Sequence, residues 1–128
     1  MPKILVVDHD TSLLESYSTE ILRGVDAEVL TAECGESAWE ILEESAVSMI
    51  ISEMKMPCGG GDWLLKRVQA LDPQPPFVVV SSGPDGPSRL FKLGVQCCFP
   101  KTQEGFALLT DFVKLWFKRD QLYRSTWG

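Results

Sequence analysis

The sequence predicts an α/β domain in which a parallel β-sheet is covered on both faces by helices. Short apolar runs alternate with amphipathic stretches along the whole chain, and the apolar runs are rich in β-branched residues. Segments rich in glycine and proline separate the two kinds of stretch. Strands that are joined by helices pair in parallel and are buried on both faces, so they read as continuous apolar runs. The pattern therefore indicates a three-layer, doubly wound α/β/α architecture.

Five apolar runs are expected to form the strands. They are Lys3–Asp8, Ala27–Ala32, Val47–Ser52, Phe77–Ser81 and Gln96–Pro100. The fourth run, with its three consecutive valines, fits a buried strand best, because β-branched residues favour strands.

Five helices are expected between and after these strands. They are a helix capped by Asp10 or Thr11 and ended by Gly24, then Glu36–Glu44, Asp62–Leu71, about Ser88–Leu93, and Gly105–Arg119 with an extension towards Arg124. Apolar residues recur at helical spacing in each longer segment. The turn over residues 83–87 (GPDGP) makes the fourth helix short.

Length and composition point to one domain and limit its functions. The 128 residues suit a single core; we expect a domain over residues 1–120 and a tail, or the start of a linker to a following domain, over 121–128. The net charge of −6 argues against direct binding of nucleic acid or an anionic membrane. No apolar stretch of about 18 residues is present to span a membrane, and the early charge at Asp8 argues against a signal peptide. We expect a cytoplasmic protein.

The four cysteines are expected to be reduced thiols. They lie at positions 34, 58, 97 and 98 and lack the paired spacing that is typical of metal sites. Disulfides are rare in reducing compartments. Cys97 and Cys98 are adjacent on a short strand and face opposite sides, so they cannot both contact one metal ion.

Polar residues follow the predicted strands at the edge where such sheets bind ligands. The functional site of an open parallel sheet lies beyond the carboxyl ends of its strands. Candidate residues at these ends are Asp8, His9, Glu53, Ser81 and Lys101. The loops around Cys34-Gly35, Gly59–Gly61 and Gly83–Gly86 lie at the same edge. The three-glycine loop lacks the GxxxxGK pattern of a phosphate loop and is expected to be a flexible connection.

Four segments in order resemble the receiver domain of two-component response regulators. They are ILVVD, IISEMKMP, VVVSS and FPK, within a resemblance that covers about residues 3 to 120. The resemblance implies a flavodoxin-like, five-stranded sheet in the order 2-1-3-4-5, as in chemotaxis regulators. It also implies a non-enzymatic role in phosphorelay signal transduction.

The resemblance assigns a role to each residue at the strand ends. Asp8, His9 and Asp10 fall in the acidic pocket, where two acidic residues of the family help to hold Mg²⁺. Glu53 falls on the phosphoacceptor position, which is an aspartate in the family. Ser81 and Lys101 fall on the positions that contact the phosphoryl group, and Cys98 falls on the position of an aromatic switch residue.

Departures from the family pattern at Glu53, His9 and Cys98, together with the expected role of Asp10 as a helix cap, predict a degenerate phosphorylation site. Glu53 is one methylene longer than aspartate; we expect it to pair with Lys101 rather than accept a phosphoryl group, and the alternative is that it turns into solvent. His9 replaces a hard oxygen ligand, so Mg²⁺ is expected to bind weakly at most. Asp10 is more typical of a helix cap than of a metal ligand. Cys98 is too small to switch as an aromatic ring does.

The expected function is therefore a phosphorylation-independent interaction module. Its partners are expected to be signalling proteins, either a histidine kinase or a downstream effector, contacted through the fourth helix, fifth strand and last helix; a homodimer is a further option. The last helix and tail carry more aromatic residues than one buried stripe needs, namely Phe106, Trp116, Phe117, Tyr123 and Trp127. Two alternatives remain. One is a phosphorylatable receiver with an unorthodox site, and the other is a small metal-binding α/β protein that uses Asp8, His9 and Glu53. No cofactor is expected, and no nucleophile–base pair indicates an enzyme.

Overall fold

Five parallel strands form one sheet in the order β2-β1-β3-β4-β5, which confirms the predicted topology. A computed structural model describes residues 1–83 and 86–127, with the exception of the side chains of residues 120, 121 and 123–127. The strands are β1 (Lys3–Val7), β2 (Glu28–Ala32), β3 (Met49–Ser52), β4 (Phe77–Ser81) and β5 (Cys97–Pro100). All five expected strands are present, with ends that differ from the expected ones by two residues at most.

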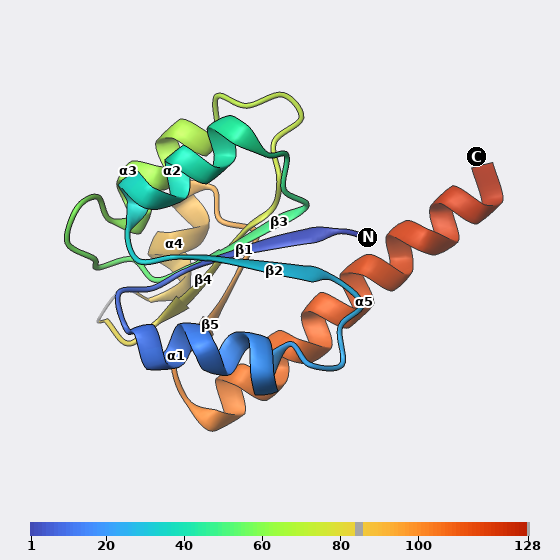
Figure 1. The fold of residues 1–128 in the computed structure, drawn as a ribbon, viewed down its shortest axis with the longest axis horizontal. Coiled ribbons are helices and arrows are strands. Elements are labelled where there is room, and N and C mark those ends of the chain that lie inside the picture. Colours follow the sequence, from blue (N-terminus) through green and yellow to red (C-terminus); the bar gives the residue numbers. More distant parts are fainter. Residues whose placement is uncertain (84–85, 128) are drawn as a thin grey trace.

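Helices cover both faces of the sheet, as the sequence predicts (Figure 1). They are α1 (Thr11–Ser16), which continues into the π-helical turn η1 (Tyr17–Ile21), α2 (Gly35–Glu44), α3 (Gly61–Val68), α4 (Pro87–Leu93) and α5 (Gln103–Trp127). In Figure 1, α2, α3 and α4 lie on one side of the sheet, and α1 and α5 lie on the other. This arrangement leaves the carboxyl ends of the strands open to the loops that form the candidate site.

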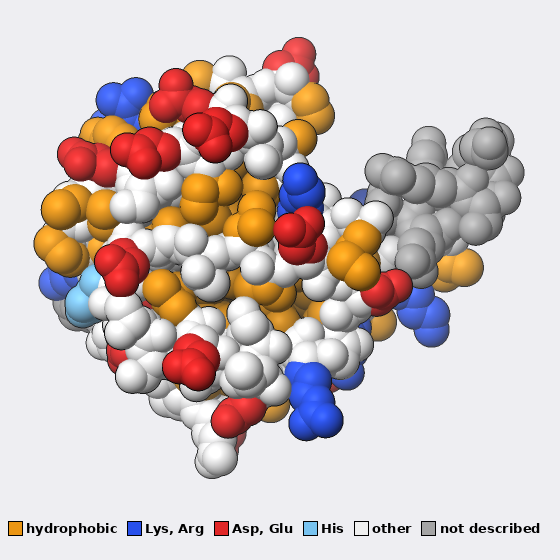
Figure 2. All heavy atoms as spheres, in the orientation of Figure 1, with side chains coloured by type: hydrophobic (Ala, Val, Ile, Leu, Met, Phe, Trp, Pro, Cys, Tyr) orange, Lys and Arg blue, Asp and Glu red, His pale blue; other side chains and the backbone are white. Residues whose placement is uncertain are grey.

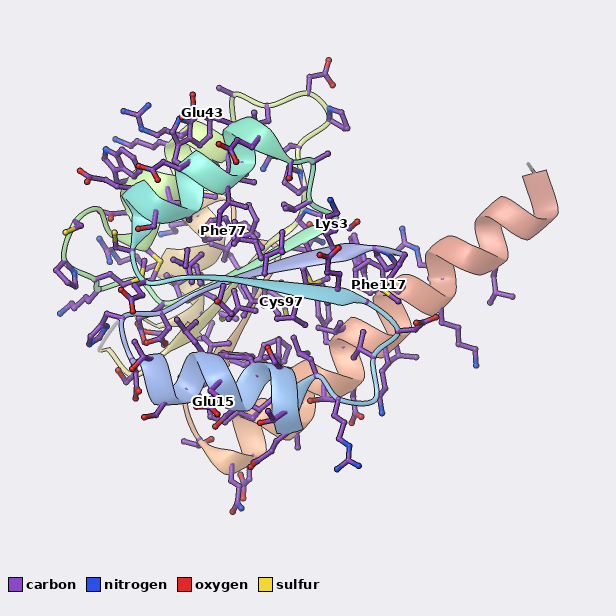
Figure 3. The ribbon with its side chains drawn as sticks, in the orientation of Figure 1. Lys3, Glu15, Glu43, Phe77, Cys97 and Phe117 are labelled. Atoms are coloured by element: carbon purple, nitrogen blue, oxygen red, sulfur yellow. The ribbon has the colours of Figure 1, made fainter. Side chains whose placement is uncertain are left out.

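Strand residues alternate between two cores, one on each face of the sheet. Leu5 and Val7 of β1 belong to the cluster under α2, α3 and α4, whereas Ile4 and Val6 pack against the residues of α1 and α5. Figure 3 shows Phe77 on the first side and Phe117 on the second. A strand turns successive side chains to opposite faces, so burial of both faces explains why the four residues of β1 after Lys3 are all apolar.

The last helix differs most from its expected bounds. It begins at Gln103 instead of Gly105 and continues to Trp127, past the expected end at Arg119 and past the expected domain boundary after residue 120. The earlier start is explained by Thr102, whose hydroxyl accepts a hydrogen bond of 3.0 Å from the N–H of Gly105. This cap satisfies a donor that the first helical turn leaves without a partner.

The aromatic residues in the described part of α5 pack inward, and leucines form the exposed apolar surface of that part. Phe106, Trp116 and Phe117 are partly buried against the core under α1 and α5. Leu108 and Leu115 are 56% and 67% exposed. The excess of apolar surface on this helix is therefore present, but its described part consists of leucines. The side chains of Tyr123 and Trp127 lie outside the described residues.

In the view of Figure 2, several acidic side chains lie close together over α2, others are spread singly over the rest of the face, and hydrophobic side chains lie between them. Among the described residues, no helix combines the length and the apolar character needed to cross a membrane.

Candidate functional site

The carboxyl ends of β1 and β3 place Asp8 and Glu53 side by side. Val7 is the register partner of Ser52, so the residue that follows each strand is also a neighbour. The N–H of Glu53 donates to the carbonyl of Val7 at 3.0 Å, which continues the ladder one step past the strands. Both side chains are buried, with 2% of Asp8 and 3% of Glu53 exposed. Two carboxylates in such a position require compensating positive charge.

Lys101 supplies this charge from the end of β5. Its Nζ lies 2.7 Å from Oδ2 of Asp8 and 2.8 Å from Oε2 of Glu53. The N–H of Lys101 donates to the carbonyl of Ser81 at 3.1 Å, which anchors the residue to the edge of β4. The expected pair between Glu53 and Lys101 is therefore present, and the alternative with Glu53 turned into solvent is wrong. Asp8 shares the same ammonium group, which the sequence reasoning did not foresee.

Backbone donors complete the environment of the two carboxylates. Asp8 Oδ1 accepts a hydrogen bond of 2.9 Å from the N–H of Asp10. Glu53 Oε1 accepts one of 2.9 Å from the N–H of Met54, and Oε2 accepts a longer one of 3.3 Å from the N–H of Ser82. Each of the four carboxylate oxygens thus contacts at least one donor, as buried polar atoms require.

The electrostatics of the pocket favour the charged forms of Glu53 and Lys101. Burial raises the pKa of Glu53, but the hydrogen bonds from Lys101 and Met54 outweigh it, and the net pKa lies below its ordinary value. Burial lowers the pKa of Lys101, but the bonds to Asp8 and Glu53 outweigh this effect and raise it. The pKa of Glu53 is lowered and the pKa of Lys101 is raised because each group stabilises the charged form of the other.

Tyr17 lies close enough to Asp8 and Glu53 for their charges to change the pKa of its phenol. Burial raises the pKa of its phenol, and the negative charges of Asp8 and Glu53 raise it further. The helical spacing of the sequence indicated only a core residue here. Its position behind the pocket depends on how α1 and η1 pack on the sheet.

Ser81 and Asp10 bind backbone atoms next to the pocket. The hydroxyl of Ser81 accepts a hydrogen bond of 3.0 Å from the N–H of Gly83, and the donor beside Glu53 is the N–H of Ser82. Asp10 caps α1, since its Oδ1 accepts a hydrogen bond of 3.2 Å from the N–H of Leu13. Its expected role as a helix cap is confirmed.

His9 and Cys98 lie at the borders of the pocket. The imidazole of His9 is 55% exposed, and its Nδ1 lies 3.8 Å from Oδ1 of Asp8. Cys98 is partly buried against the core under α2, α3 and α4. Burial raises the pKa of its thiol, and the neighbouring Cys97 adds to the effect. The aromatic residue of this strand is Phe99, which faces α5 and lies 5.8 Å from Phe112 between ring centroids.

The residues present fit Mg²⁺ poorly. This ion requires several oxygen ligands in octahedral geometry, but the ammonium group of Lys101 bridges the inner oxygens of both carboxylates. Next to Asp8, the chain offers an imidazole instead of a third carboxylate. Within the described residues, no group of three or more His, Cys, Asp or Glu side chains is arranged to hold a metal ion.

The sequence could not reveal the backbone donors of Met54 and Ser82. Every residue except proline carries an N–H, so residue type gives no signal for this role. Their positions depend on the course of the loops after β3 and β4.

A doubly wound sheet with a buried acidic pair and a lysine at its carboxyl edge defines the receiver class of α/β signalling proteins. The family model of the response regulator receiver domain matches residues 4–112. The chain therefore belongs to the response regulator receiver domain family, and its role lies in two-component signalling.

Individual relatives agree with this assignment. A response regulator receiver protein of Anaeromyxobacter sp. (strain Fw109-5) is 29% identical over 82 residues, which cover 64% of this chain and 34% of the relative. The two-component response regulator-like protein PRR37 of Oryza sativa subsp. indica is 37% identical over 68 residues, 52% of this chain and 9% of the relative. The matched segments thus span about a third and about a tenth of these relatives' own lengths.

The solved receiver domain of the Francisella response regulator 1452 superposes with a TM-score of 0.79 at 20% identity, over 94% of this chain and 99% of that one. This similarity supports the fold.

Proposed function

We propose that this receiver domain is a protein-interaction module that acts without phosphorylation. The ion pairs in its own pocket hold the domain in a single conformation. The observation that carries the proposal is the position of Lys101, whose ammonium group lies 2.7 Å from Asp8 and 2.8 Å from Glu53. In a phosphorylated receiver, the corresponding lysine contacts the phosphoryl group. Here the longer glutamate already brings a negative charge to it, although a phosphoryl group would carry nearly two charges.

Phosphoryl transfer to Glu53 is disfavoured for two reasons. The extra methylene displaces the carboxylate by roughly 1–1.5 Å from the position of an aspartate carboxylate, and an error near 1 Å costs on the order of 100-fold in a positioned reaction. The charge that develops in phosphoryl transfer also needs a metal ion. The shared lysine and the imidazole of His9 leave a poor Mg²⁺ site, so we propose that the domain needs no cofactor.

The exposed apolar residues of α4 and α5 are the proposed partner surface. Phe91 and Leu93 of α4, and Leu108 and Leu115 of α5, are all at least 37% exposed. An effector or kinase with a complementary apolar surface would cover them, as the cores of protein interfaces are depleted in charge. A signalling protein is the proposed partner, and self-association is an outcome that the measurement of mass in solution would show.

The test is phosphotransfer with radiolabelled acetyl phosphate and Mg²⁺. We expect no label on the wild type or on Glu53→Gln, whereas Glu53→Asp, which restores the shorter side chain, gains measurable label. Glu36→Gln removes an exposed carboxylate and serves as the matched control. Label on the wild type that disappears in Glu53→Gln would overturn the proposal and favour a phosphorylatable receiver. Saturable metal binding in calorimetry would favour the metal-binding alternative.

A further inference from the structure

The two loops that border the pocket next to β2 and β3 bring Cys34 and Cys58 together. Cys34 follows β2 and is the N-cap residue of α2. Cys58 lies in the loop between β3 and α3. The sequence separates the two thiols by 24 positions and offers no sign that they meet. Cys97 and Cys98 lie on β5, at the far edge of the sheet.

Two backbone hydrogen bonds fasten these loops to each other. The N–H of Gly35 donates to the carbonyl of Gly59 at 2.8 Å, and the N–H of Glu36 donates to the carbonyl of Cys58 at 3.1 Å. The approach is so close that a Cβ on Gly35 would lie 2.6 Å from the carbonyl oxygen of Gly59. The spacing of the two segments is therefore fixed by backbone contacts and does not depend on flexible side chains.

The backbone of Cys58 is itself unusual. Its φ of 57° lies in the left-handed region, which residues with a Cβ rarely adopt. A conformation of this kind costs about 1–2 kcal/mol, and it persists only where surrounding contacts impose it. The hydrogen bond from Glu36 is one such contact, and the loop is also covered by the ring of Trp63, on which Arg67 stacks at 4.3 Å.

The two thiols have different environments. Cys34 is 8% exposed, and its sulfur lies 3.4 Å from the hydroxyl of Ser37, whereas Cys58 is exposed. Burial raises the pKa of Cys34, but hydrogen bonds with Ser37, the backbone and the thiol of Cys58 outweigh it, and the net pKa is lowered. The pKa of Cys58 is raised, first by the charge of Cys34 and then by their hydrogen bond. Such an asymmetry is typical of an attacking and a resolving thiol.

We propose that Cys34 and Cys58 are a redox-active dithiol that hydrogen peroxide oxidises to a disulfide, with Cys34 as the attacking thiolate. A small oxidant is required because Cys34 is nearly covered. The inference is independent of the proposed function, since it concerns only the contact of residues 34–36 with residues 58–59.

The reaction balances in two steps. The Cys34 thiolate attacks one oxygen of the peroxide; the S–O bond forms, the O–O bond breaks, and the hydroxide that leaves takes up the proton that the thiol had lost. The sulfur of Cys58 then attacks the sulfenic acid at Cys34; the S–S bond forms, the S–O bond breaks, and water leaves with the Cys58 proton. Two thiols are oxidised, and one peroxide is reduced to two molecules of water.

The disulfide would join the loop after β3 covalently to the start of α2. The same loop contains Met54, whose N–H donates to Glu53. Oxidation would therefore restrain a segment that contributes to the pocket, without any phosphoryl group.

The test is peptide mapping after oxidation with one equivalent of hydrogen peroxide. Trypsin places Cys34 in peptide 24–55, Cys58 in peptide 56–66, and both remaining cysteines in peptide 93–101. After free thiols are blocked with N-ethylmaleimide, we expect peptides 24–55 and 56–66 to appear joined, with the loss of two hydrogens. Dithiothreitol should separate them.

Three variants make the result specific. Cys58→Ser should lose the joined peptides and retain a sulfenic acid at Cys34 that dimedone traps, and Cys34→Ser should give neither product. Cys97→Ser should form the joined peptides as the wild type does. Because Cys58 is exposed, its replacement leaves the core intact even if Cys34→Ser unfolds. Absence of the joined peptides in the wild type, earlier oxidation of peptide 93–101, or no dimedone adduct in Cys58→Ser would overturn the proposal.

Discussion

Replacement of Lys101 by methionine should destabilise the domain by about 3 kcal/mol at pH 7. Methionine keeps the unbranched side chain up to the ε position, without the terminal ammonium group, and so leaves Asp8 and Glu53 as buried carboxylates without a counterion. At an effective dielectric constant near 20, unit charges 2.8 Å apart attract by roughly 6 kcal/mol, and desolvation offsets much of this. Removal of one partner from a buried pair typically costs about 3–5 kcal/mol. We take the lower end because 17% of the Lys101 side chain is exposed to screening by solvent.

This loss should be visible in thermal and urea denaturation. An unfolding entropy of about 2.1 cal/mol/K per residue gives roughly 270 cal/mol/K for a domain of this size, so 3 kcal/mol lowers Tm by about 11 °C. Lys118→Met, which removes an exposed lysine, is the matched control and should change Tm by less than about 2 °C. In the double variant Lys101→Met/Glu53→Gln, part of the stability should return, because one of the opposing charges is gone.

The stability of the Lys101→Met variant relative to the wild type should increase as the pH falls. Without the ammonium group, one of the two carboxyl groups can relieve the repulsion by taking up a proton. The deficit of Lys101→Met should therefore shrink between pH 7 and pH 5. A loss of stability below about 1 kcal/mol in Lys101→Met, or a loss that stays constant between pH 7 and pH 5, would refute the conclusion that Lys101 compensates two buried carboxylates.

Further predictions concern pH, packing, capping and switching. The folded pKa of Glu53 is lowered, so its contribution to stability is present above the ordinary value of 4.5 and is lost as pH falls through the lower folded value; urea titrations from pH 6 to pH 3 should fall more steeply for the wild type than for Glu53→Gln. A Cβ on Gly105 would overlap a backbone carbonyl at the end of β5, whereas one on Gly86 would meet nothing within 4 Å; Gly105→Ala should lower Tm markedly and Gly86→Ala should leave it nearly unchanged, and equal effects would contradict the packing described. Asp10→Ala should lose about 1 kcal/mol through the missing helix cap, and Asp10→Asn, which can still cap, should lose less in the same urea titration. Acetyl phosphate with Mg²⁺ should leave the NMR chemical shifts of Cys98 and β5 unchanged, because β5 carries no aromatic switch at that position; large shifts there would show that a switch is intact.

The pattern of residues along the chain is enough to predict the class of fold and the edge of the sheet at which the site lies. The alternation of apolar runs with segments of helical spacing is a local property of the sequence. Burial of both faces of a parallel sheet makes the inner strands β1, β3 and β4 visible as apolar runs such as residues 4–7. The carboxyl ends of the strands then follow directly, and with them Asp8, Glu53 and Lys101. The resemblance to receiver domains added the strand order and the expected pair of Glu53 with Lys101.

Which groups meet at that edge depends on how distant segments of the chain pack together. Lys101 contacts two carboxylates because the residues that follow β1, β3 and β5 lie close together in the fold. No local sequence pattern predicts this proximity. Ser81 binds Gly83 because the loop after β4 turns back on its own strand. Cys34 and Cys58 meet because two loops lie at backbone contact, in a geometry that depends on a left-handed residue and on glycines without side chains. Contacts between distant segments depend on loop paths and packing, which residue type and spacing leave open.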